Sequence, residues 1–402
     1  MTGNGGSPSP ELVVVGAGTM GAWTALLARR AGLTTTLIDA FGAGHSRATS
    51  GDETRIIRAS HGEDRLYAAW SRTAREAWIA FGELTGETIF VPAGALWLAH
   101  REDGFERASE TLLREMAIPV ERLSPDDIAA RWPQIAADDL AFATFEPEAG
   151  LLMARRGVAA VARRFAEEGG RVALASARPG RSSGRRLLDV ATDDGGSVTA
   201  EQFVFAAGPW LPRLFPDVLG DLIRVTKQDV VFVGTPAGDG RFGADQLPCW
   251  VDYDAAFYGL PAVEGRGMKL APDRYGPVFD PTHGERIVDP ESVRLARRYL
   301  ARRFPGLAEA PVVETRVCQY ETTPDTHFVI DRHPDFDNCW LVGGGSGHAF
   351  KQGPVIGEVV VGRLMGRAAG EDEARFALGH TRVPRANMRT GADGMVEGWS
   401  DW

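Results

Sequence analysis

Residues 11–21 read ELVVVGAGTMG, a short apolar run that leads directly into Gly16-x-Gly18-x-x-Gly21 and then into an Ala-rich, helix-prone segment. In a strand–turn–helix unit of this kind, the first glycine allows the tight turn and the second lets the backbone approach a pyrophosphate. The third glycine lets the helix pack on the strand. The free N–H groups at the helix N-terminus then face the phosphates. The stretch therefore predicts a dinucleotide-binding unit.

The next predicted strand completes this unit. Residues 34–38, TTTLI, are followed by Asp39, a carboxylate placed to accept a hydrogen bond from a ribose hydroxyl. NAD and FAD are bound by the same arrangement, so these residues alone leave the dinucleotide open. We expect the contacts to this cofactor to come from Gly16, Gly18, Thr19, Met20, Gly21 and Asp39.

Length and charge limit the remaining possibilities. The chain has 402 residues, more than one simple core usually holds, so two intimately joined domains are expected. A net charge of −10 disfavours nucleic acid as a partner, because its phosphate backbone would be repelled. The three cysteines form no CxxC pair, which argues against a zinc site or a disulfide framework.

No segment is predicted to enter a membrane. No apolar run approaches the ~20 residues that a spanning helix needs. Residues 1–10 also lack the apolar core of a signal peptide. We therefore expect a cytoplasmic protein without a membrane partner, with residues 1–10 and 385–402 as mobile tails.

Hydrophobic periodicity predicts an α/β protein. Alternating runs over residues 224–270 predict an antiparallel sheet, the candidate substrate domain. In TRIIR, residues 54–58, Arg55 and Arg58 are one helical turn apart, which predicts that both guanidinium groups face one side. The alternative for these arginines is a solvated basic edge. Helices are predicted over residues 67–84, 152–168, 290–304 and 354–365.

Two further strands end in glycine. FVFAAG ends at Gly208, which indicates a second backbone approach to a ligand, although a packed strand end would have the same sequence. Residues 339–345, CWLVGGG, lead through SGHAFK into the last predicted helix. A helix N-terminus directed at the pyrimidine edge of a flavin stabilises the anionic charge of its reduced form. NAD needs no such site, so FAD is favoured, with further contacts from Ala207, Gly208, Gly345, Ser346 and Gly347.

At this point the sequence resembles the monomeric sarcosine oxidase and N-methyltryptophan oxidase family, within the D-amino-acid-oxidase-like flavoproteins. The motifs that carry the resemblance are VVVGAGTMG, GDETRIIRASHGED, FEPEAG, AAGPW, GMKL, TPDTHFVID and GSGHAFK. The resemblance implies a glutathione-reductase-like FAD domain that is discontinuous, with a substrate domain built on a largely antiparallel sheet. The FAD domain is expected over residues 11–85, 151–223 and 320–370, and the substrate domain over residues 86–150 and 224–319.

The family's reactive positions map onto three residues here. Cys318 matches the cysteine that joins the flavin through a thioether to its 8α-methyl carbon, where a thiolate can add to an electrophilic methide. A buried inert cysteine is the alternative reading. Lys269 matches the lysine that activates O₂ by stabilising developing negative charge, and its alternative is a surface lysine at a strand end. Arg55 matches a second arginine near the flavin.

The substrate positions follow in the same way. Arg58 and Lys351 match the pair that holds the substrate carboxylate. Tyr258 matches an aromatic wall of the substrate site, and His348 is expected to position its neighbours. Phe257 stands where the sarcosine-specific members have tyrosine. Asp273 departs from the family, which has a histidine there, and this implies a substrate with a different amine or an additional cationic group.

The resemblance implies an FAD-dependent amine oxidase acting on a secondary or cyclic α-amino acid with a carboxylate. A hydride would pass from the carbon next to a neutral amine to the flavin, giving an imine, and O₂ would be reduced to H₂O₂. A monomer is expected. Two alternatives stay open: a flavin dehydrogenase or multi-electron tailoring oxidase on a cyclic imino acid, and a flavin subunit of a larger electron-transfer complex.

Overall fold

Strand β1 (Leu12–Val15) lies inside a six-stranded sheet, between β2 (Thr35–Asp39) and β15 (Gln202–Phe205). All four of its side chains are buried, as expected for a parallel strand that is covered on both faces. The computed structural model describes residues 10–384. Its sheet order here is β21-β22-β15-β1-β2-β9, and every pairing is parallel except that of β21 with β22. The two edge strands are β9 (Arg171–Leu174) and β21 (Val329–Arg332), and β22 (Cys339–Gly343) lies between β21 and β15.

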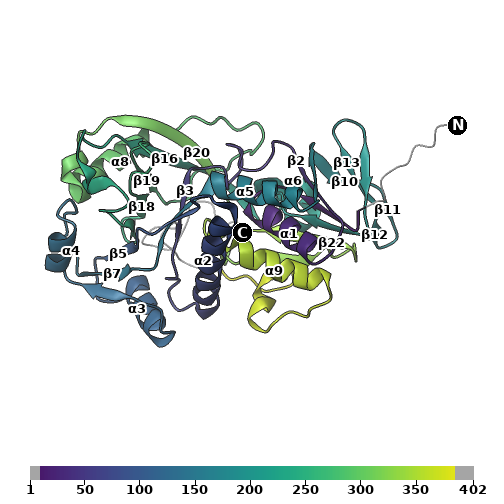
Figure 1. Ribbon diagram of the computed structural model, residues 1–402, viewed down its shortest axis with the longest axis horizontal. Coiled ribbons are helices and arrows are strands. Elements are labelled where there is room, and N and C mark those ends of the chain that lie inside the picture. The colour runs from purple at the N-terminus through teal and green to yellow at the C-terminus, as the bar shows by residue number, and fades with distance from the viewer. Residues whose placement is uncertain (1–9, 385–402) are drawn as a thin grey trace. The chain divides into compact units, whose positions relative to one another are not determined.

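The described residues form two units, each assembled from separate stretches of the chain (Figure 1). Unit 1 comprises residues 10–52, Ala154–Arg224 and Glu321–Val383, and unit 2 comprises Glu53–Met153 and Val225–Tyr320. Residues 53–85 and 151–153, which were expected in the FAD domain, lie in unit 2. The reason is that β3 (Thr54–Ile57) pairs with β8 (Gly150–Met153) there. The predicted tails lie outside the described residues, apart from Pro10.

Three helices flank the sheet of unit 1. Helix α1 (Thr19–Arg30) packs on both α5 (Ala154–Glu167) and α9 (Gly353–Leu364). The predicted helices at residues 152–168 and 354–365 are thereby confirmed to within two residues. Unit 1 also contains short elements between α5 and β15 and after it: β10 (Ala177–Pro179), β11 (Ser182–Ser183), β12 (Arg186–Leu187), β13 (Asp189–Thr192), β14 (Ser197–Thr199), α6 (Leu211–Leu214) and α7 (Pro216–Leu219).

Unit 2 is built on an eight-stranded sheet of order β20-β16-β19-β18-β17-β5-β7-β6. The antiparallel pairing predicted for residues 224–270 is confirmed, since β16, β19, β18 and β17 pair antiparallel where they meet. The pairing of β17 with β5 is parallel. The strands are β5 (Ala95–Ala99), β6 (Glu121–Leu123), β7 (Phe142–Glu146), β16 (Arg224–Val233), β17 (Cys249–Asp252), β18 (Phe257–Leu260), β19 (Met268–Pro272) and β20 (Val312–Thr322).

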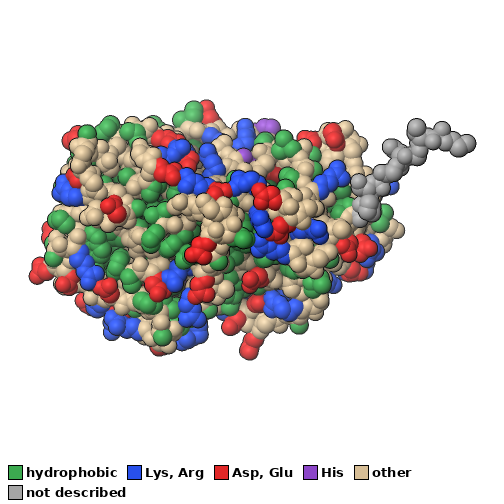
Figure 2. Space-filling view, in the orientation of Figure 1, with side chains coloured by type: hydrophobic (Ala, Val, Ile, Leu, Met, Phe, Trp, Pro, Cys, Tyr) green, Lys and Arg blue, Asp and Glu red, His purple; other side chains and the backbone are tan. Residues whose placement is uncertain are grey.

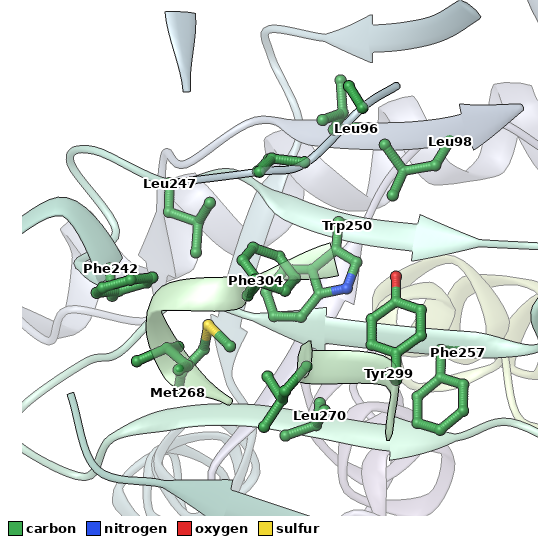
Figure 3. Packing of buried hydrophobic residues seen from close by; sticks show 14 of the residues in the cluster. Leu96, Leu98, Phe242, Leu247, Trp250, Phe257, Met268, Leu270, Tyr299 and Phe304 are labelled. Carbon is green, nitrogen blue, oxygen red and sulfur yellow. The ribbon is translucent and has the colours of Figure 1, made fainter. Parts of the chain in front are cut away.

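An apolar core lies between this sheet and helix α8 (Pro290–Arg303), as Figure 3 shows. The ring centroids of Trp250 and Phe304 are 4.6 Å apart, and those of Phe257 and Tyr299 are 4.4 Å apart in a stacked arrangement. Both contacts join the helix region to strands of the sheet. Burial of such large side chains stabilises the fold by about 2 to 3 kcal/mol each.

A buried ion-pair network fixes the C-terminal end of α8. Arg303 is 1% exposed and contacts Asp139 at 2.8 Å and Asp252 at 3.4 Å. The hydroxyl of Tyr299 also donates to Asp252, at 3.2 Å. Because removing one partner would leave a buried charge uncompensated, these residues act as a structural group.

The remaining elements of unit 2 include a small sheet of order β3-β8-β4, with β4 at Phe90–Val91. The interpretation of TRIIR as a helical turn is wrong: its first four residues form β3, held by pairing with β8. The three-residue spacing in a strand does not bring two side chains to one face. The predicted helix at residues 67–84 is confirmed. The helices of this unit are α2 (Arg65–Thr85), α3 (Phe105–Glu115), α4 (Pro125–Arg131) and α8.

The surface carries charges of both signs. On the face drawn in Figure 2, acidic and basic side chains are interspersed. Among residues 10–384, no helix has the length and apolar character that crossing a membrane requires.

Candidate active site

The turn after β1 distinguishes the three glycines of the first motif. Gly16 has a φ of +104°, and a Cβ there would lie 2.4 Å from the carbonyl oxygen of Ala206. A Cβ at Gly21 would lie 1.9 Å from the carbonyl oxygen of Gly16. At Gly18, the nearest atom to an added Cβ is Ser50 Oγ, at an ordinary 3.5 Å. Gly16 and Gly21 therefore serve the packing of strand and helix, while Gly18 leaves the start of α1 approachable.

Thr19 and Met20 begin α1. The Thr19 N–H donates to Ser50 Oγ at 3.1 Å, and its hydroxyl donates to the carbonyl oxygen of Phe350, also at 3.1 Å. Met20 is 6% exposed. Because Phe350 follows the Gly-rich turn after β22, the Thr19 hydroxyl links the first Gly-rich turn to the second.

Asp39 ends β2 beside this turn. Its Oδ2 accepts from the Ala17 N–H at 2.7 Å, and its Oδ1 accepts from Phe41 and Gly42 at 2.8 and 2.9 Å. The carboxylate thus fixes the turn between β1 and α1. A carboxylate has about four acceptor positions, so the predicted ribose contact is compatible with these bonds and stays a prediction.

The second Gly-rich segment lies at the ends of β15 and β22, which are neighbours in the sheet. Ala207 precedes Gly208, which has a φ of +54°. After β22, Ser346 has a φ of +46°, and its hydroxyl donates to the carbonyl oxygen of Gly344 at 2.9 Å. Gly345 lies between these two residues, and Gly347 follows at +73°. The backbone therefore turns repeatedly just before α9.

Lys351 and His348 belong to the same segment. The Lys351 ammonium is 3% exposed and donates to the carbonyl oxygen of His348 at 2.9 Å. His348 Nε2 bonds to the carbonyl oxygen of Thr326 at 2.9 Å, and its ring lies 4.9 Å from that of Phe328. The positioning role expected of His348 stays a prediction.

Glu321 adjoins the same turn and was not identified from the sequence. Its Oε1 accepts from the Gly345 N–H at 3.4 Å, and its carbonyl oxygen accepts from the Ser346 N–H at 2.9 Å. Burial raises the pKa of this carboxyl to about 8, against the opposing effect of the Gly345 and Gly344 N–H groups. Because successive side chains of a strand point to opposite faces, the sequence could have indicated that Glu321 and Cys318 face opposite sides of β20. It could not have indicated that Glu321 is buried.

These groups fit a dinucleotide cofactor. In open parallel sheets, ligands bind at the carboxyl ends of the strands, and β1, β15 and β22 all end here in turns. The start of α1 is approachable at Gly18, and the buried Glu321 Oε2 has no hydrogen-bond partner within the described residues. An approachable helix N-terminus beside a buried polar atom that lacks a partner within the described residues is compatible with a bound dinucleotide.

Lys269 lies in unit 2, on β19. It is 1% exposed, and its ammonium donates to the carbonyl oxygen of Thr54 at 2.9 Å. Thr54 begins β3, so this bond joins the eight-stranded sheet to the small one. The alternative of a surface lysine at a strand end does not hold, because the side chain is buried.

Cys318 lies on β20, and its sulfur accepts a hydrogen bond from Arg55 Nη2 at 3.2 Å. Arg55 belongs to β3, as does Thr54. A cation against a sulfur atom is the environment of reactive cysteines. Burial raises the pKa of the thiols of the other two cysteines, Cys249 and Cys339.

Arg58 follows β3 and lies away from Arg55. Its guanidinium is 5.0 Å from the centroid of the Trp97 ring and donates to the carbonyl oxygen of Ser60. Glu146, in the FEPEAG motif, accepts from the Ala59 N–H at 2.6 Å and from Trp97 Nε1 at 3.1 Å. Glu146 thus fixes both the backbone beside Arg58 and the ring beneath it. Arg58 lines a pocket together with Ile57, Ala59, Ser71, Arg72, Arg75, Ile118, Pro119, Glu146, Glu148 and Ala149.

Tyr258 and Phe257 alternate on β18. Tyr258 packs against the apolar group that contains Cys318, whereas Phe257 is stacked on Tyr299 in the core. Phe257 therefore faces the apolar core, whereas Tyr258 faces Cys318. Asp273 is 4% exposed, and the hydroxyl of Tyr320 donates to its Oδ1 at 3.0 Å.

The predicted residues are thus divided between the units. Unit 1 contains the Gly-rich turns, Asp39, His348 and Lys351. Unit 2 brings Arg55, Cys318 and Lys269 together around β3, with Tyr258 packed against Cys318. Within residues 10–384, no group of three or more His, Cys, Asp or Glu residues could hold a metal ion.

Comparison with known proteins agrees with this geometry. Residues 11–363 match the family model described as FAD dependent oxidoreductase. The chain belongs to this family of FAD-dependent oxidoreductases. It is similar to the monomeric sarcosine oxidase of Bacillus sp. (strain NS-129), with 30% identity over 94% of this chain and 99% of that protein. It is also similar to the N-methyl-L-tryptophan oxidase of Yersinia pestis (strain Pestoides F), with 27% identity over 92% and 99%.

Solved structures support the fold of this FAD-dependent oxidoreductase. Fructosyl peptide oxidase from E. terrenum aligns with a TM-score of 0.82 and 21% identity, over 95% of this chain and 94% of that one. At this identity the likeness concerns the fold alone. The expected fold class is confirmed, as are the FAD cofactor and an oxidoreductase of the sarcosine oxidase type.

Proposed function

We propose that this flavoprotein oxidises the C–N bond of a secondary or cyclic α-amino acid. The observation that carries the proposal is the group around β3, in which Arg55 donates to the Cys318 sulfur and the buried Lys269 donates to Thr54. When bound, FAD accepts a hydride from the carbon next to the amine and passes the electrons to O₂, so that an imine and H₂O₂ result.

The residues of unit 2 have distinct roles in this proposal. Lys269 places a fixed positive charge where O₂ gains electrons, and a preorganised charge of this kind stabilises a developing anion. Arg58 binds the substrate carboxylate, with Trp97 and Glu146 holding its surroundings. Arg58 and Lys351 lie in different units. The expectation that both bind the same substrate carboxylate therefore rests on the sequence resemblance.

Cys318 is proposed to form the covalent bond to the flavin. The test is acid precipitation of the purified protein followed by visible spectroscopy of pellet and supernatant. We expect a yellow pellet in the wild type and a yellow supernatant in Cys318→Ala. The matched control is Cys249→Ala, which changes a buried thiol on another strand and should keep the flavin with the pellet. A colourless wild-type pellet would contradict covalent attachment.

Asp273 is proposed to set substrate choice. A buried carboxylate favours a cationic or hydrogen-donating substituent over a second carboxylate. A peroxide-coupled screen of N-methyl, cyclic and D-amino acids identifies the best substrate, and sarcosine is expected to be poor. Asp273→His should then shift relative kcat/KM toward simple N-methyl amino acids, and an unchanged ratio would remove Asp273 from the proposal.

The same screen separates the alternatives. Peroxide formation by the isolated chain supports an oxidase. Turnover only with an artificial electron acceptor would indicate a dehydrogenase, and inactivity without a partner protein would indicate an electron-transfer subunit.

A further inference from the structure

Glu321 occupies an unusual position for an acidic residue. It is 6% exposed and lies near the end of β20, where unit 1 resumes. Its carboxyl oxygens lie 3.8 and 3.9 Å from where a Cβ of Gly208 would be, and one lies 3.4 Å from the same position of Gly343. The carboxyl is therefore enclosed by glycines at the ends of β15 and β22.

Only part of this carboxyl is satisfied within the protein. Oε1 accepts the long bond from Gly345, while Oε2 has no hydrogen-bond partner within residues 10–384. An unpaired buried polar group destabilises the fold unless a bound molecule satisfies it. Because burial raises its pKa to about 8, the group is a neutral acid at pH 7, with an O–H to donate.

Charged neighbours do not account for the raised pKa of Glu321. The pKa of Glu321 is raised by burial and opposed by two backbone N–H groups. The ammonium of Lys351 donates to His348, and His348 Nε2 bonds to Thr326. The unpaired oxygen thus lies beside the glycines at the ends of β15 and β22. Among residues 10–384, no ion pair of Glu321 explains its burial.

We propose that Glu321 contacts the flavin of bound FAD as a neutral carboxylic acid and donates a hydrogen bond to it. This contact adds a side-chain donor to a site otherwise made of backbone N–H groups. A donor to the flavin stabilises the electron-rich reduced form more than the oxidised form. The inference rests on membership of the FAD-dependent family, and it is independent of the amine substrate and of covalent attachment.

The experiment measures the two-electron reduction potential of the flavin in the holoenzyme by equilibration with a reference dye. Glu321→Met removes the donor at similar size, and Glu321→Gln keeps an N–H donor. We expect Glu321→Met to lower the reduction potential of the flavin by about 30 mV, which corresponds to an about tenfold weaker preference for the reduced form. Glu321→Gln should shift it much less.

Glu106 provides the matched control. It is 4% exposed, lies on α3 of unit 2, and has an Oε1 without a partner among the described residues. Burial raises its pKa to about 7. Glu106→Met should leave the potential unchanged. A wild-type potential in folded Glu321→Met, or an equal shift in Glu106→Met, would overturn the proposal. Thermal melting of each holoenzyme establishes that the variants are folded.

Discussion

The two units build their functional regions from different materials. In unit 1, the residues proposed to contact the cofactor are mainly glycines in turns at the ends of parallel strands, as at Gly18 and Gly345. In unit 2, the residues proposed to take part in the reaction are charged side chains, and Lys269 and Arg55 bond to atoms of other strands. A backbone site depends on the path of the chain, whereas a side-chain site depends on individual groups. Changes in unit 1 should therefore affect folding and cofactor retention together, and changes in unit 2 should affect single steps.

The largest expected effect tests this difference within unit 1. Gly21→Ala places a Cβ 1.9 Å from a carbonyl oxygen, so the turn must move, and we expect a loss of more than about 3 kcal/mol and little folded protein. Gly18→Ala meets no such obstacle and should fold, while losing bound FAD. Circular dichroism and flavin absorbance measure the two effects. Equal folding of both variants would contradict the separation of roles.

The next effect concerns unit 2. Lys269→Met should slow reoxidation of the reduced enzyme by O₂ about a hundredfold, roughly 3 kcal/mol, because a preorganised positive charge is lost. Reduction by substrate should change far less. Stopped-flow absorbance separates the half-reactions. Lys227→Met, which changes a lysine paired with Asp229 on β16, is the control. Equal slowing of both half-reactions would make Lys269 structural.

A smaller effect is expected for Arg58→Ala. Loss of a charge-assisted contact to the carboxylate should weaken binding of the amino acid by about 2 to 3 kcal/mol and leave the flavin in place. Arg72→Ala changes another arginine that lines the same pocket and should alter binding by less than about 0.5 kcal/mol. Flavin reduction titrated with substrate gives both values, and similar losses would indicate a diffuse electrostatic effect.

The smallest effect tests whether unit 1 also depends on single charges. Hydrogen bonds from Arg30, with a contribution from Arg164, lower the pKa of Glu168 to about 2. A lowered pKa contributes stability that is complete above the unfolded value of 4.5 and is lost as the pH falls toward 2. After allowance for solvent screening, the contribution is about 1 kcal/mol. Glu168→Gln should lose this amount at pH 7 and much less at pH 2, as measured by urea unfolding.

Local sequence was sufficient for the cofactor unit. The spacing of Gly16 and Gly21 reflects a contact within one turn, and the periodic segments at residues 152–168 and 354–365 are helices as predicted. In these cases the interacting residues are close in sequence, so the pattern contains the cause.

The substrate unit depended on distant pairings. Arg55 and Arg58 have helical spacing, yet residues 54–57 form a strand. The reason is their pairing with β8, which lies about a hundred positions later in the sequence. Glu146 and Trp97 could not be assigned to the surroundings of Arg58, because their contacts arise only when β5 and β7 pair. Glu321 was missed for the same reason, since its burial comes from turns that follow β15 and β22.

The strand order of unit 1 also determines when the unit can form during synthesis. Its central strand β1 is made first, but its neighbour β15 ends at Phe205 and the next strand, β22, ends at Gly343. At roughly 5–20 residues per second, the ribosome leaves the edge of β15 unpaired for on the order of ten seconds. An unpaired edge of this kind is a site for association with other chains. Newly made chains are thus most exposed to aggregation just before their last strand emerges, which makes slow translation of the final third a hazard for yield.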